Sequence, residues 1–377
     1  MNDHPSTPNR LAHAAGDDWS VVSLSVVEQL GPLDAGGRVG FVYLTDSMAG
    51  NVDAVVDALR AGTGITDWIG TVGVSVFADA MEYSGRPAMA ALTMAMPKGT
   101  YRLFTDVGQC RPPEAAAVSG YALEVSMPVG IVHADPRSDA ITDMLRAAAE
   151  ESGAFIIGGL ASSRGEHAHI AGGRVMRGGM SGVVFDGNVR VQTGLSQGCS
   201  PLGPAHQVTE GSDTVIMAID GRRPLDVLSA EAGERVMRDL RDLAEHVHVA
   251  FHVTGSDRRD YLVRTLVGID PLRGWIAVGE RVAVGDRIAF VRRDPDSARQ
   301  DLAAMTADLR SRLPGPARGA LYFSCVARGR HMFGAPGAEL SVLRSQLGDV
   351  PLIGFSCAGE ISNARLYGYT GVLAVFT

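Results

Sequence analysis

Apolar residues gather along this chain in short strand-like runs, and three stretches repeat one order of elements. The stretches cover residues 40–97, 130–185 and 320–376. Each opens on an apolar run, continues through a segment with helical spacing, reaches an apolar-Ile-Gly step and closes on a second apolar run. Strand, helix and strand in this order are typical of a βαβ-type unit. We therefore expect a mixed α/β (α+β) protein whose recurring strand-helix-strand units form sheets flanked by helices.

The apolar-Ile-Gly step is the most regular part of the repeat. It occurs at residues 68–70, 156–158 and 352–354, and a loop rich in Gly, Ser or Cys follows each copy. Open α/β sheets tend to bind ligands at such strand ends, so these loops are candidate sites. The spacing differs between copies, which indicates recurrent supersecondary structure and not a solenoid of fixed period.

The remaining pattern predicts the domain organisation. Helical stripes of apolar residues predict helices over residues 51–59, 110–119, 138–151, 235–246 and 295–313, with Ser138 as a cap. Strands are predicted at 214–219 and, as an antiparallel meander, at 261–269, 275–276 and 287–291. Residues 192–213 are rich in Gly, Pro and Ser and predict a connector. We expect a disordered tail over 1–20 and two domains, 21–211 and 212–377.

Composition narrows the class of protein. Hydrophobic residues make up 46% of the 377 and charged residues 20%, which is enough for a sizeable core. A net charge of −8 disfavours nucleic acid or an anionic membrane as partner. Without a secretory signal or an apolar run of roughly 18 residues, we expect a cytoplasmic protein. The four cysteines show no CxxC spacing, so we predict reduced thiols, no metal and no cofactor.

The segments 323–334 and 354–361 carry the richest chemistry, because each comes directly after an apolar strand. Together they offer Cys325, Arg328, Ser356, Cys357 and Glu360. If the two strands are neighbours, their loops converge, and an arginine with a glutamate can hold a zwitterion. Two other interpretations stay open: a structural salt bridge between Arg328 and Glu360, or a catalytic thiol at Cys325, which needs a base and an electropositive setting.

Other motifs support no site. Gly354–Gly359 nearly matches the G-x-S-x-G nucleophile elbow, but a strand follows it where the motif requires a helix. The His-x-His pairs at 167/169 and 246/248 have no acidic or Cys ligand at a suitable interval, so we interpret them as ordinary histidines. A P-loop is absent from the sequence.

Taken in order, the segments resemble the FIST family. The N-terminal part is matched by VGFVYLTD at 39–46, IGTVG at 69–73 and IIGGLASS at 156–163, and the junction by QGCSPLGP at 197–204. The C-terminal part is matched by ALYFSCVARGRHMFG at 320–334, Glu339, VPLIGFSCAGEI at 350–361 and YTGVLAVF at 369–376. The resemblance covers residues 38–377.

The resemblance implies a bacterial sensory module of signal transduction that binds a small ligand, such as an amino acid or related metabolite, and carries no transferable catalytic set. No output domain is evident, so we expect a stand-alone module that signals through an unidentified protein partner. Alternatives are a cysteine-dependent enzyme using Cys325 and a ligand-free interaction scaffold. The ligand-binding residues that we predict are Cys325, Arg328, Glu339, Gly354, Ser356, Cys357, Glu360, Gly158, Gly159 and Ser162.

Overall fold

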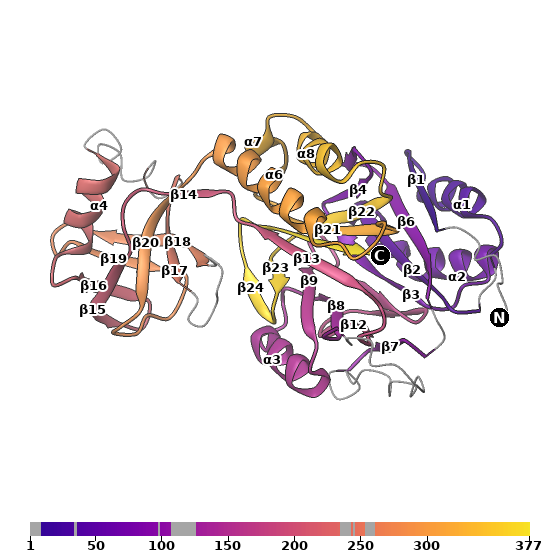
Figure 1. Cartoon of the computed structure of the whole chain (residues 1–377), viewed down its shortest axis with the longest axis horizontal. Helices are drawn as coiled ribbons and strands as arrows, with labels where there is room; N and C mark the ends of the chain where they lie inside the picture. Colours follow the sequence, from indigo (N-terminus) through magenta and orange to yellow (C-terminus); the bar gives the residue numbers. More distant parts are fainter. Residues whose placement is uncertain are drawn as a thin grey trace. The chain divides into compact units, whose positions relative to one another are not determined.

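The computed structural model describes residues 9–33, 36–96, 99–106, 126–233, 243, 246–252 and 261–377. The chain divides into two compact units (Figure 1). One contains residues 1–196 together with 301–377, and the other contains residues 197–300. The second unit is thus an insertion in the sequence of the first, whereas we expected two consecutive domains.

The first unit contains three strand-helix-strand repeats, each with two parallel strands side by side. The parallel pairs are β2 (Arg38–Thr45) with β3 (Trp68–Gly73), β8 (Val129–Ala134) with β9 (Phe155–Leu160), and β21 (Gly319–Cys325) with β22 (Leu352–Cys357). Their connecting helices are α2 (Val52–Thr63), α3 (Ile141–Ser152), and the pair α7 (Gly329–Phe333) and α8 (Ala338–Leu347). The predicted fold class and its three recurring units are confirmed.

Each parallel pair belongs to a six-stranded sheet. Two further strands of that sheet come from the same repeat and run antiparallel to their neighbours. The closing strands β6 (Ala88–Ala95), β12 (Met180–Phe185) and β25 (Gly371–Phe376) lie next to the first strand of each parallel pair. The edge strands β1 (Arg10–Ala15), β7 (Tyr101–Phe104) and β13 (Val191–Ser196) lie outside the closing strands. Sheet composition is therefore the same in all three repeats.

The last two strands of every sheet are a hairpin that comes from a different repeat. The hairpins are β4–β5 (Ser75–Ala78, Met81–Ser84), β10–β11 (His169–Ala171, Arg174–Met176) and β23–β24 (Glu360–Ser362, Arg365–Tyr367). The hairpin of the first repeat pairs with β22 of the third, that of the second pairs with β3 of the first, and that of the third pairs with β9 of the second. This cyclic exchange ties the three repeats into one body with approximately threefold connectivity.

The glycine of the apolar-Ile-Gly step allows the two parallel strands of each repeat to lie close together. Gly70, Gly158 and Gly354 sit opposite Val42, Val132 and Tyr322, respectively. At each position an added Cβ would overlap the carbonyl oxygen of that neighbour. A side chain is therefore excluded at the same register position in all three repeats, which explains why the sequence repeats this step.

The repeats meet at a buried aromatic cluster. Tyr43, His133 and Phe323 each follow the residue that faces a step glycine, and all three are fully buried. Their ring centroids lie 5.5 Å (Tyr43–His133), 6.3 Å (Tyr43–Phe323) and 6.1 Å (His133–Phe323) apart. Phe355 stacks on Tyr43 at 4.9 Å. Equivalent positions of the three repeats thus form the centre of the core.

The second unit is a small antiparallel barrel. Six strands close in the order β20, β15, β16, β19, β18 and β17, because β17 pairs with β20 as well as with β18. Their bounds are Arg287–Arg293, His206–Ser212, Val215–Ile219, Trp275–Val278, Tyr261–Asp270 and Val247–His252; β14 (Cys199–Pro201) adds to β20, and α4 (Pro224–Ala232) follows β16. The predicted meander is correct for β18 and β19, but β20 pairs with β15 and β17 instead of β19.

Several local predictions were wrong. Residues 10–15, expected in a disordered tail, form β1, and helix α1 spans Trp19–Leu30. The expected connector contains β13, β14 and β15. Ser138 does not cap α3, which begins at Ile141; its hydroxyl instead accepts a hydrogen bond from Gly179 N–H at 2.9 Å.

Other helix predictions have different outcomes. The helix predicted over 295–313 is confirmed as α6 (Pro295–Ser311). The helix predicted over 110–119 and most of that predicted over 235–246 lie outside the described residues.

Candidate functional site

The predicted loops converge at the carboxyl ends of β21 and β22. These strands run parallel in register, so Ser324 lies beside Ser356 and Cys325 beside Cys357. The next backbone step keeps the ends together, because Val326 N–H donates to the Cys357 carbonyl at 2.9 Å. Side chains from both loops therefore share one buried region at the strand ends.

Arg328 and Glu339 form a buried ion pair in this region. Arg328 Nε donates to Glu339 Oε1 at 2.6 Å, and the two side chains are 1% and 5% exposed. Tyr322 Oη donates to the same oxygen at 2.6 Å, and Ser324 Oγ donates to Oε2 at 3.0 Å. Burial disfavours the charged guanidinium, but Glu339 and its neighbours raise the pKa of Arg328 above its ordinary value. Both charges are thus fully compensated, as a buried pair requires.

This geometry changes one interpretation of the sequence. The expected structural partner of Arg328 was Glu360, whereas the structure pairs Arg328 with Glu339 on the first turn of α8. Glu360 acts on Arg328 only as a nearby charge that raises its pKa further.

Glu360 is buried and only half satisfied. Its Oε2 accepts hydrogen bonds from the Thr370 N–H at 3.1 Å and the Thr370 hydroxyl at 2.8 Å. Its Oε1 is buried and has no partner with hydrogen-bond geometry in the part of the chain that the structure describes. Burial raises the pKa of this carboxyl to about 8, against the opposing effects of Thr370, Arg328 and the Cys325 thiol. Burial therefore favours the protonated form of Glu360, which can donate a hydrogen bond as well as accept one.

The two cysteines lie beside Glu360 as thiols. Burial, followed by the charge of Glu360, raises the pKa of Cys325 to about 12. The same causes raise the pKa of the fully buried Cys357 well above its ordinary value. Because only the thiolate is a good nucleophile, this environment argues against a catalytic role for Cys325.

The predicted residues of the second repeat are Gly158, Gly159 and Ser162, and they contact the region around Glu360 mainly through backbone groups. Gly159 pairs with Glu360 across β9 and β23, and a Cβ at Gly159 would overlap Cys357 Sγ. Ser162 Oγ donates to the Ser356 carbonyl and accepts from Val74 N–H, so one hydroxyl links all three repeats. Gly158 and Gly354 are the step glycines, and their contribution is close strand packing.

The sequence analysis missed the polar groups that complete this cluster. Thr370 donates a hydrogen bond to Glu360, and Tyr322 and Ser324 donate hydrogen bonds to Glu339. Tyr322 and Ser324 lie in an apolar-looking strand, and alternation alone could have suggested that both face the same side. Nothing in the local pattern marks Thr370 as a partner of Glu360, because that contact depends on the turn between β24 and β25.

Two general classes of site find no support in the described residues. In that part of the chain, no group of three or more His, Cys, Asp or Glu side chains could hold a metal ion. Among the described helices, none has both the length and the apolarity needed to cross a membrane.

Comparison with known proteins identifies the class to which this architecture belongs. The FIST N domain model matches residues 38–222, and the FIST C domain model matches residues 224–363. The chain belongs to the FIST family, whose domains are regarded as small-ligand-binding sensory modules of signalling proteins.

Its relatives include mycobacterial proteins of matching length. The uncharacterized protein Rv0628c of Mycobacterium tuberculosis is 31% identical over 362 residues, covering 91% of this chain and 92% of the relative. The uncharacterized protein Mb0898c of Mycobacterium bovis is 31% identical over 361 residues, with the same coverage. The similarity thus extends over both units and is not confined to one domain.

Proposed function

We propose that this protein is a cytoplasmic sensory module that binds a small ligand, an amino acid or related metabolite, at the ends of β21 and β22. A partner protein would carry the signal onward. The observation that carries the proposal is Glu360, whose buried Oε1 has no partner with hydrogen-bond geometry among the described residues and whose carboxyl interacts with the Cys325 thiol, a weak donor. A buried polar atom without a partner costs roughly 1–3 kcal/mol, and a ligand group placed there would recover that energy.

The surroundings of Glu360 suit an ammonium group better than an anion. Glu339 already neutralises Arg328, so Arg328 has no uncompensated positive charge with which to bind an anion. Glu360 can lose its proton and pair with a cation. Val326 and Ala358, which directly follow the two strands, are exposed, so the strand ends lie close to the protein surface.

The proposal predicts that ligand binding is linked to pH. An ammonium ligand favours ionised Glu360, and burial raises the pKa of this carboxyl, so the affinity is expected to rise with pH, by up to about tenfold per pH unit, until the carboxyl is fully ionised. Glu360→Gln keeps the shape but cannot ionise, so weak, pH-independent binding is expected. The measurement is a thermal-shift screen against amino acids and common metabolites, followed by calorimetric titration of any hit between pH 6 and 9.

Glu28→Gln is the matched control, because Glu28 is an exposed residue of α1. A saturating ligand adds about 2.7 kcal/mol at a hundredfold excess over Kd, which moves the midpoint by several degrees. If no compound shifts the midpoint, or if Glu360→Gln and Glu28→Gln bind a hit with equal affinity and equal pH dependence, the assignment of the site fails.

A further inference from the structure

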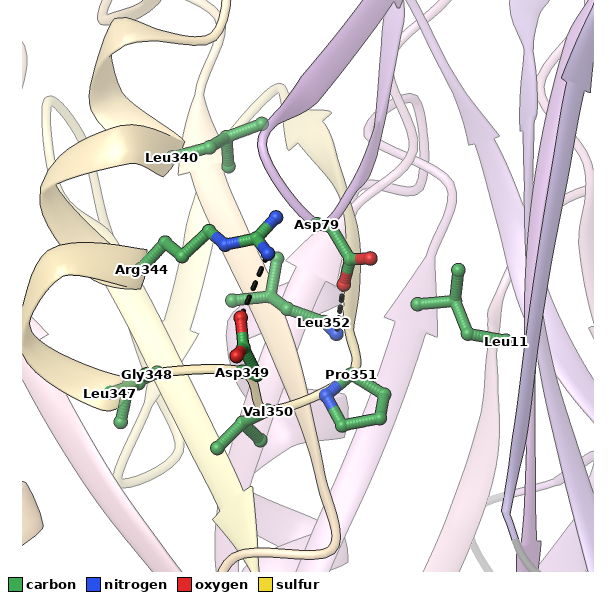
Figure 2. Close-up of a pocket in the computed structure, with 10 residues that line it drawn as sticks. All are labelled: Leu11, Asp79, Leu340, Arg344, Leu347, Gly348, Asp349, Val350, Pro351 and Leu352. Atoms are coloured by element: carbon green, nitrogen blue, oxygen red, sulfur yellow. Dashed lines mark hydrogen bonds and ion pairs between the residues drawn. The ribbon is translucent and has the colours of Figure 1, made fainter.

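A cavity of about 120 Å³ lies beside the end of α8, at the amino end of β22 (Figure 2). Its apolar lining comes from Leu11, Leu340, Leu347, Val350, Pro351 and Leu352. Leu352 is the first residue of β22 and Cys357 is the last, so the cavity and the Glu360 region lie at opposite ends of one strand. At roughly 3.3 Å per residue the two ends are about 17 Å apart. The cavity is therefore separate from the candidate site described above.

Charged groups lie on two sides of this cavity. Arg344 extends from α8 and pairs with Asp349 at 2.8 Å, where the Asp349 side chain is 90% exposed (Figure 2). Asp79 lies on the other side and accepts a hydrogen bond from Leu352 N–H through Oδ1 at 3.2 Å. Within the described parts of the chain, Asp79 forms no ion pair, whereas Arg344 already has one. The uncompensated charge at the cavity is therefore negative.

The end of α8 adds to this negative field. The helix ends at Leu347, and Gly348 N–H caps the Arg344 carbonyl. Carbonyl groups at a helix C-terminus carry a partial negative charge and favour nearby cations. Leu347 and Gly348 line the cavity, so this end of the helix faces the same space as Asp79.

We propose that the cavity binds a small amphipathic cation, a primary ammonium group carried on a short branched aliphatic body. The ammonium group lies at Asp79 and the C-terminal end of α8, and the aliphatic body lies against the leucines. Size sets the limit: a water occupies about 30 Å³, and a dry cavity of about 150 Å³ holds benzene, so this cavity takes about five or six non-hydrogen atoms.

Three probes with nearly the same carbon skeleton separate charge from shape: isobutylamine (a cation at neutral pH), isobutanol and isobutyrate. Each is titrated into the full-length protein while the leucine methyl resonances of Leu340, Leu347 and Leu352 are followed by NMR. We expect isobutylamine to shift all three resonances with an affinity about tenfold higher than isobutanol, and isobutyrate to bind more weakly than both.

Asp79→Asn is the deciding variant. Asp79 has φ +49°, a conformation that Asn tolerates well, and the amide oxygen can still accept the bond from Leu352 N–H. The variant thus removes only the charge, and the affinity for isobutylamine is expected to fall to that of isobutanol. Arg344→Gln, in contrast, is expected to leave amine binding unchanged or stronger.

Two results would overturn the proposal. Tighter binding of isobutyrate, lost in Arg344→Gln, would assign an anion site. Unchanged leucine resonances with all three probes would show that the cavity takes no ligand of this kind. Neither result bears on Glu360, since the Glu360 titration monitors the other end of β22.

Discussion

Three ionisable groups in this protein differ in the number of charged side chains that contact them directly. Arg328 keeps its charge because Glu339 lies in direct contact with it. Glu360 lacks a direct cation, so the structure favours its neutral form. His206 in the second unit lies between two carboxylates: Nδ1 is 2.6 Å from Asp220 Oδ2, and Nε2 is 2.6 Å from Glu231 Oε1. The number of direct charge partners, more than burial itself, decides which form each group adopts.

His206 provides a pH-dependent test. Burial disfavours its protonation, but the hydrogen bonds to Asp220 and Glu231 outweigh this effect and raise the pKa of His206. Only the protonated imidazolium has two N–H donors, so only this form of His206 can donate a hydrogen bond to both carboxylates. The stabilisation is therefore complete below about pH 6.5, the unfolded-state pKa, and is lost as pH rises through the higher folded-state pKa.

The measurement is the His206 pKa by NMR, together with urea unfolding of residues 197–300 followed through their methyl resonances at pH 6 and pH 9. We expect stability to fall between these pH values in the wild type, and to change less in His206→Gln. His252 gives an internal comparison, because burial lowers its pKa. A His206 pKa at or below that of His252 would contradict this account.

At the scale of elements, the sequence pattern predicts the three repeats but not the exchange of hairpins between them. The parallel strands and the step glycines recur visibly in the sequence, so three strand-helix-strand units were predictable. The hairpins were not, because strands of three or four residues are too short to show alternation. Their partners are also distant: Phe77 of β4 pairs with Gly354 of β22.

The candidate site was predictable to the same degree. Convergence of the loops after β21 and β22 follows from parallel pairing, which the apolar runs suggested. The partner of Arg328 did not follow, because Glu339 and Glu360 are both acidic residues of the same repeat. Only the position of α8 brings Glu339 to 2.6 Å from Arg328.

The step glycine gives the clearest test at this scale. In Gly354→Ala the new Cβ would overlap the Tyr322 carbonyl oxygen in the centre of a sheet, and backbone cannot move aside as a flexible side chain can. We expect a loss of about 3 kcal/mol or more in the free energy of unfolding, at the upper end of overpacking costs. Gly368→Ala is the matched control, since no atom lies within 4 Å of its added Cβ. Urea denaturation of both variants measures the difference; equal midpoints would refute the packing argument.

At the scale of the whole molecule, residues 197–300 interrupt the third repeat between its edge strand β13 and the first strand of its parallel pair, β21. The whole barrel lies between these two strands in sequence, and α6, which begins at Pro295, leads from the barrel to β21. The two ends of the insertion are neighbours, because Cys199 of β14 pairs with Arg293 of β20 in antiparallel register. Paired residues of this kind have Cα atoms about 5 Å apart, a gap that a short turn can close.

This geometry predicts that the insertion can be removed. A chain that joins Cys199 to Arg293 through a two-residue Asn-Gly turn is expected to fold, because the three repeats keep their exchanged hairpins, their aromatic cluster and the Glu360 region. Circular dichroism, a cooperative thermal transition and retained NMR shifts for Phe323 and Phe355 would show this. The complementary fragment, residues 197–300, is expected to fold alone as a closed barrel, since its six strands leave no open sheet edge among themselves. If the shortened chain is unfolded while the fragment folds, the repeats depend on the insertion for their stability and the prediction is wrong.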